Sequence, residues 1–63
     1  MTRNLSDESR RALEWHERLV DELKSLEQQG LSDRARRARH AHLSEELRDL
    51  AASEAYLDGV AAQ

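Results

Sequence analysis

Gly30 divides this sequence into two long runs of mostly helix-forming residues; the second glycine, Gly59, lies near the C-terminus, and no proline interrupts either run. Glycine is the usual residue just beyond a helix C-terminus, because it adopts the left-handed conformation without steric cost. Ser32 follows and can accept hydrogen bonds from the free amides of a second helix. Asp33 would then lie in the first turn of that helix, where the helix dipole favours a negative charge. The sequence therefore predicts a helix, a tight turn and a second helix.

The composition favours an all-α fold. The 63 residues include ten Leu and nine Ala, but only two Val, one Thr, and no Ile or Phe. Leu, Ala, Glu and Arg form helices readily, whereas strands need β-branched and aromatic residues. We expect one domain, an antiparallel two-helix hairpin. Its parts are a helix over about residues 6–29, a turn over about 30–32, a helix over about 32–57 and a frayed tail over 58–63.

Two short patterns bear on the helix boundaries. The pattern Leu-Ser-Asp-x-x-Arg-Arg-Ala occurs at residues 5–12 and again at 31–38, and the similarity ends there. We interpret it as a helix-start signal used twice. A fainter copy begins at Leu43 and Ser44, which leaves open whether the second helix breaks near Ser44. Because no Gly or Pro is nearby, we expect that helix to continue.

The apolar residues of the first helix cover nearly half of its circumference at 3.6 residues per turn. One neighbouring helix is too narrow to cover such a face, so we expect the hairpin to dimerise into a four-helix bundle. The sequence leaves open whether the partner is a second copy or a larger protein. The residues expected at the interface are Ala12, Trp15, His16, Leu19, Val20, Leu23, Leu26, Leu43, Leu47, Leu50 and Leu57.

Four arginines lie at the start of the second helix, where the helix dipole disfavours cations. They could contact an acidic protein or the phosphates of a nucleic acid. A helix that reads a groove would hold such residues on one face, whereas these point around most of the circumference. We therefore favour a solvated or protein-facing segment, neutralised in part by acids such as Glu22 and Glu27. The four are Arg34, Arg36, Arg37 and Arg39.

The same arginines are expected to behave differently from one another. Arg39 continues the line of Leu43 and Leu47, so its stem should lie along apolar surface. Its guanidinium should then reach an acid on an adjacent helix or on a partner. Arg34 and Arg37, on the far side of the helix, should stay solvated.

Catalytic, metal and cofactor sites have little support in the sequence. No Ser/His/acid arrangement and no glycine-rich phosphate loop is present, so we expect neither an enzyme nor a bound cofactor. His40 and His42 are two residues apart and would point in different directions from a helix. His42 and Glu46 form the only local pair with chelating geometry, and we expect no metal site. His16 is expected in the apolar seam. Tyr56 is expected either at the rim of the interface or exposed.

Composition also limits the function class. The chain has no Cys, so no disulfide framework and no thiol chemistry are expected, which is consistent with the cytoplasm. It has no apolar run long enough to cross a membrane. Its net charge of -3 argues mildly against general attraction to nucleic acid or anionic lipid. We expect a small non-enzymatic protein–protein interaction or dimerisation module, of a regulatory or adaptor kind. The alternative is a dimeric nucleic-acid-binding regulator that uses the arginines.

Overall fold

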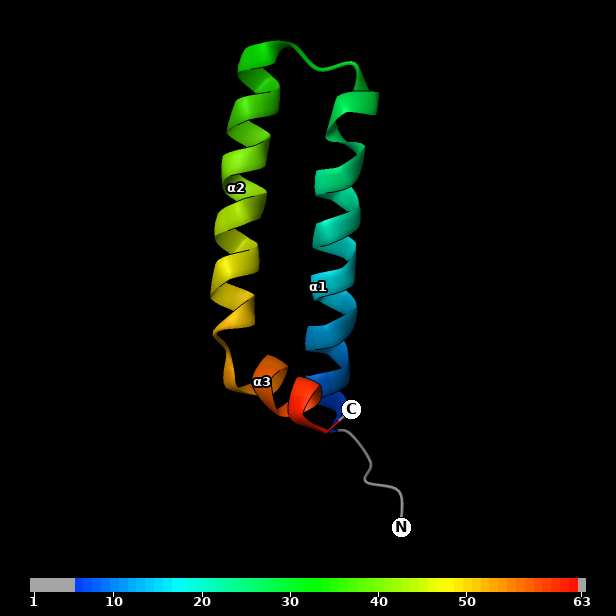
Figure 1. Cartoon of the computed structure of the whole chain (residues 1–63), viewed down its shortest axis with the longest axis vertical. Helices are drawn as coiled ribbons and strands as arrows, with labels where there is room; N and C mark the ends of the chain where they lie inside the picture. Colours follow the sequence, from blue (N-terminus) through cyan, green and yellow to red (C-terminus); the bar gives the residue numbers. More distant parts are fainter. Residues whose placement is uncertain (1–5, 63) are drawn as a thin grey trace.

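The computed structural model describes residues 6–62, and this part of the chain is all-α, as expected. It contains α1 (Asp7–Ser25), the short 3-10 helix η1 (Leu26–Gln29), α2 (Asp33–Ala51) and α3 (Glu54–Ala61). Helices α1 and α2 run antiparallel, side by side, and α3 crosses the end of the pair that lies opposite the turn (Figure 1). The molecule is elongated, with extents of 50 × 19 × 14 Å. We expected two helices, whereas this part of the chain forms three α-helices.

The repeated pattern starts both long helices in the same way. In each copy the serine hydroxyl accepts a hydrogen bond from the amide three residues later, which satisfies one of the free N–H groups of the first turn. The aspartate that follows pairs with the arginine three residues beyond it. The distances are 3.1 Å for Ser6–Ser9 and 2.9 Å for Asp7–Arg10 in α1, and 3.2 Å for Ser32–Ala35 and 3.1 Å for Asp33–Arg36 in α2.

Gly30 ends the first helical run as the sequence predicts. Its backbone is left-handed, with φ 68° and ψ 24°, and it is the C-cap of η1. No non-glycine residue among 6–62 has a positive φ. The turn between α1 and α2 therefore depends on the one residue type that takes this conformation readily.

The expected helix over 6–29 is α-helical only to Ser25. Beyond it the backbone tightens, since the amide of Leu26 bonds to the carbonyl of Leu23, three residues back. The Ser25 hydroxyl donates to the Glu22 carbonyl at 3.1 Å and accepts from the Gln29 side chain at 3.1 Å. Serine in a helix often bonds back to the preceding turn in this way.

The prediction of one continuous helix over 32–57 is wrong for its last part. α2 continues through Ser44 without a break and ends at Ala51. Ser53 then caps a new helix: its hydroxyl accepts from the amide of Tyr56 at 3.3 Å and donates to the carbonyl of Leu50 at 2.6 Å. One side chain thus closes α2 and opens α3. The tail expected to fray over 58–63 is helical to Ala61, and residue 63 lies outside the described residues.

The core lies in the seam between α1 and α2. Leu19, Leu26 and Leu43 are buried together, and further leucines on both helices pack against them. Leu19 and Leu26 are seven residues apart, so they return to the same face of the helical run after two turns. The partly buried leucines at this seam are Leu23, Leu47 and Leu50.

α3 covers a second strip of α1, beside this seam. A Cβ placed on Gly59 would lie 3.1 Å from the Leu13 side chain and 3.3 Å from the carbonyl oxygen of Ser9. The rings of His16 and Tyr56 stack at the same contact, with centroids 4.7 Å apart and an angle of 25°. Part of the wide apolar face of α1 is therefore covered by the chain itself. Within residues 6–62 no helix is both long enough and apolar enough to cross a bilayer.

Candidate functional site

Most of the predicted interface residues are used in the chain's own packing. All of them are at least partly buried except two, Trp15 and Leu57, which are 47% and 54% exposed. The others divide into a fully buried set and a partly buried set. Ala12, Leu19, Leu26 and Leu43 are buried, and His16, Val20, Leu23, Leu47 and Leu50 are partly buried.

Within residues 6–62, the exposed large apolar side chains lie at three places, of which one is Leu31 in the turn, 40% exposed. Trp15 stands on α1 beside a small groove of about 220 Å³, whose walls include Glu22 and Arg39. Leu57 and Val60 stand on α3, where they are 54% and 45% exposed. The sequence pointed to Trp15 and Leu57 but not to Val60, because the tail was expected to fray.

Two of the four arginines are paired with acids of the same chain. Arg36 contacts Asp33 at 3.1 Å within α2, and Arg39 contacts Glu22 across the seam at 3.2 Å. The prediction that the guanidinium of Arg39 reaches an acid on an adjacent helix is confirmed. Both side chains of the Arg39–Glu22 pair are about half exposed, which limits the stability that the pair contributes.

Arg34 and Arg37 remain in solvent. Both are exposed, and neither forms an ion pair with another residue in 6–62. They match the expectation that the far side of this helix stays solvated. Within the cluster of four, these two arginines are the ones without an ion pair in the described residues.

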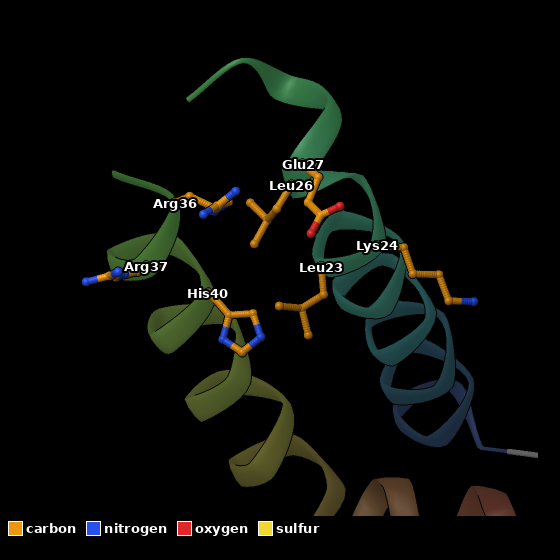
Figure 2. Close-up of a pocket in the computed structure, with 7 residues that line it drawn as sticks. All are labelled: Leu23, Lys24, Leu26, Glu27, Arg36, Arg37 and His40. Carbon is orange, nitrogen blue, oxygen red and sulfur yellow. The ribbon is translucent and has the colours of Figure 1, made fainter. Parts of the chain in front are cut away.

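An open cleft of about 540 Å³ lies between the two helices at the turn end. Its floor is apolar and its rim is basic. In Figure 2, Leu23 and the ring of His40 point toward each other across the cleft, while Lys24 and Arg37 point outward on either side. We call this site the turn-end cleft, and it is lined by Leu23, Lys24, Leu26, Glu27, Arg36, Arg37 and His40.

The sequence identified only part of this cleft. Leu23 and Leu26 were predicted from their helical spacing, and Arg36 and Arg37 from their charge. Lys24 and His40 were not singled out for this role, because they join the site only once the two helices have a fixed register. No pattern within either helix alone carries that information.

The histidines do not form a metal centre in the described residues. His42 pairs with Glu46 at 3.1 Å, as their spacing allows. Across residues 6–62, no three side chains of His, Cys, Asp or Glu gather closely enough to hold an ion. His16 lies at the edge of the seam, but its ring partner is Tyr56 of α3. Tyr56 is therefore a partly buried contact of α3 with α1.

Charge is unevenly distributed along the molecule. All four arginines of the cluster lie in the half of α2 next to the turn, whereas residues 41–62 hold five acids and one arginine. α3 itself carries Glu54 and Asp58 and no basic residue. Along α2 and α3, the cations thus gather next to the turn and the acids toward the opposite end.

No protein-family model, no curated protein and no solved structure matches this chain. The functional residues are therefore inferred from the chain's own geometry. Two features of residues 6–62 stand out, at opposite ends of the long axis. One is the turn-end cleft with its basic rim, and the other is the acidic, partly apolar surface of α3.

Proposed function

We propose that this protein is a small, non-enzymatic protein–protein interaction module that associates with itself. The observation that carries the proposal is the balance of buried and exposed apolar side chains. Trp15, Leu57 and Val60 are each about half exposed. Against them stands a small core, since the buried apolar residues of 6–62 are Ala12, Leu19, Leu26 and Leu43.

Burying the exposed side chains against another chain would be favourable, at roughly 25 cal/mol for each Å² of apolar surface removed from water. A chain of this size has little core to stabilise it, so association is a common means of adding buried surface. α3 covers the face of α1 near one end only. At the other end the cleft leaves Leu23 partly exposed. These features support a partner that adds to the core.

A nucleic-acid ligand is the second candidate. Arg34 and Arg37 favour it, because both are exposed cations on one helix. The ion pairs of Arg36 and Arg39 with the chain's own acids count against it, as does the net charge of -3. Binding to a generic nucleic acid should therefore be weak, with a slope of log affinity against log salt close to zero. A slope of several units would favour the nucleic-acid function instead.

Self-association is tested by sedimentation equilibrium combined with thermal unfolding. Over a range of concentration on the order of a hundredfold, we expect the average mass to rise from one chain to two and Tm to rise with it. The rise in Tm follows because association stabilises only the folded chain. A folded monomer at every concentration would contradict the proposal.

A further inference from the structure

We infer that the partner is a second copy that lies antiparallel to the first, with the exposed side of its α3 in the turn-end cleft. Each copy would offer one cleft and one α3, so the two chains would make the same contact twice around a twofold axis. This inference rests on the self-association proposed above. It adds which surfaces meet and how the two chains are oriented.

The cleft and α3 lie on the same side of the molecule. α3 contacts α1 at Leu13 and His16. The cleft is lined by Leu23, seven positions after His16, and by Glu27, fourteen positions after Leu13. An α-helix returns to nearly the same face every seven residues, so Leu23 lies on the side of α1 that carries His16. One end of that side is raised by α3 and the other end is hollowed by the cleft.

The two ends have complementary charges. The exposed surface of α3 presents Glu54 and Asp58. The cleft presents Lys24, Arg36 and Arg37 against the single carboxylate of Glu27. Arg36 also contacts Asp33, so among the cations that line the cleft Lys24 and Arg37 form no ion pair with another residue in 6–62. Opposite charges on facing surfaces fix the orientation in which two chains meet.

The apolar groups match as well. Leu57 stands on the exposed side of α3, next to Asp58 and three residues after Glu54. In the cleft, Leu23 and Leu26 form an apolar floor between the charged side chains. A leucine flanked by acids therefore faces leucines flanked by cations. Such a contact buries apolar surface in its centre and leaves the charges at its rim.

Antiparallel pairing satisfies both contacts at once. The cleft and α3 lie near opposite ends of a molecule 50 Å long, so reversing the second copy brings each α3 to the other copy's cleft. An arrangement with a twofold axis closes after two chains and leaves no unpaired copy of either surface. Trp15 lies outside the contact, because its groove shares no lining residue with the cleft.

Charge reversal tests the pairing directly. Arg37→Glu and Asp58→Lys each place like charges in both contacts, and we expect each variant alone to dimerise at least tenfold more weakly than wild type. In an equimolar mixture, one contact of the heterodimer joins an unchanged Arg37 to an unchanged Asp58. The other contact joins the two substituted side chains, whose charges are opposite once more. The mixture should therefore form a heterodimer with an affinity within about threefold of wild type. Native mass spectrometry resolves it, since the two variants differ in mass.

Arg34→Glu is the matched control, because it makes the same charge change in the same helix outside the cleft. This variant should dimerise like wild type, and circular dichroism checks that all variants are folded. If Arg37→Glu and Asp58→Lys dimerise as tightly as wild type, or if the mixture is not rescued, the contact lies elsewhere and the inference is wrong. In that case self-association itself still stands. If wild type is a monomer throughout, the proposed function is wrong too.

Discussion

Single residues decide where the helices begin and end, and their roles were largely readable from the sequence. Ser6, Ser32 and Gly30 act through hydrogen bonds and backbone angles within a few residues of themselves. Arg39 was predictable to the extent that it continues a leucine line. Its partner Glu22 could not be assigned before the register of α1 against α2 was known, because an ion pair across the seam depends on that register.

Gly30 offers a clean test of the turn. Its φ of 68° is unfavourable for a residue with a side chain, while nothing lies within 4 Å of a Cβ placed there. Gly30→Ala should thus lower the free energy of unfolding by about 1 kcal/mol, through backbone strain alone. Chemical denaturation followed by circular dichroism measures it. Gly30→Asn should lose less, since Asn tolerates this conformation better, and an Ala variant as stable as wild type would contradict this role for Gly30.

The Arg39–Glu22 pair tests how much a half-exposed ion pair contributes. Arg39→Ala should lower the stability of the fold modestly, because it removes both the ion pair and the packing of the arginine stem. A double-mutant cycle with Glu22→Ala should give a coupling free energy of about 0.2–1 kcal/mol. Arg34→Ala is the control and should leave stability unchanged. A coupling of zero would show that the contact does not stabilise the fold.

At the scale of whole elements, α3 is the part that the sequence did not reveal. The helical run is interrupted just before Ser53, although neither Gly nor Pro, the residues that usually mark a helix end, stands there. The available signal was a serine followed by Glu54 directly after the leucine stripe of α2. Gly59 was a second signal, since a small residue within a helix allows another backbone to come close. From the sequence alone, neither signal outweighs an unbroken run of helix-forming residues. The break is favoured only by the packing of α3 on α1, which the sequence does not show.

The close approach of α3 to α1 can be tested at Gly59. Gly59→Leu would favour the helix by propensity, yet its side chain would meet Leu13 and the Ser9 carbonyl at little more than 3 Å. We expect α3 to be displaced, at a cost of about 1–3 kcal/mol, with faster hydrogen exchange of its amides. Ala61→Leu places the same side chain at an exposed position of α3 and should have little effect. Unchanged exchange in the Gly59 variant would mean that α3 is not held by this contact.

At the scale of the whole molecule, the sequence predicted that α1 has more apolar face than one neighbour can cover. It could not predict that α3 would cover one end of that face and leave the other end open. That division depends on where Ser53 turns the chain back toward α1. α3, which carries Glu54 and Asp58, lies at the end of the molecule opposite the turn, where the cluster of four arginines begins α2. The two ends of the molecule therefore differ in both shape and charge.

This asymmetry makes the salt dependence of self-association informative. If α3 of one copy lies in the cleft of the other, two charged contacts hold each dimer, and added NaCl screens both. The Debye length falls from about 10 Å at 0.1 M to about 3 Å at 1 M, so we expect the dimer dissociation constant to rise on the order of tenfold over this range. A dimer formed through the exposed ring of Trp15 would depend mainly on apolar burial, which salt does not weaken. Sedimentation equilibrium at several NaCl concentrations separates the two arrangements, and a dissociation constant that stays level or falls would exclude pairing of α3 with the cleft.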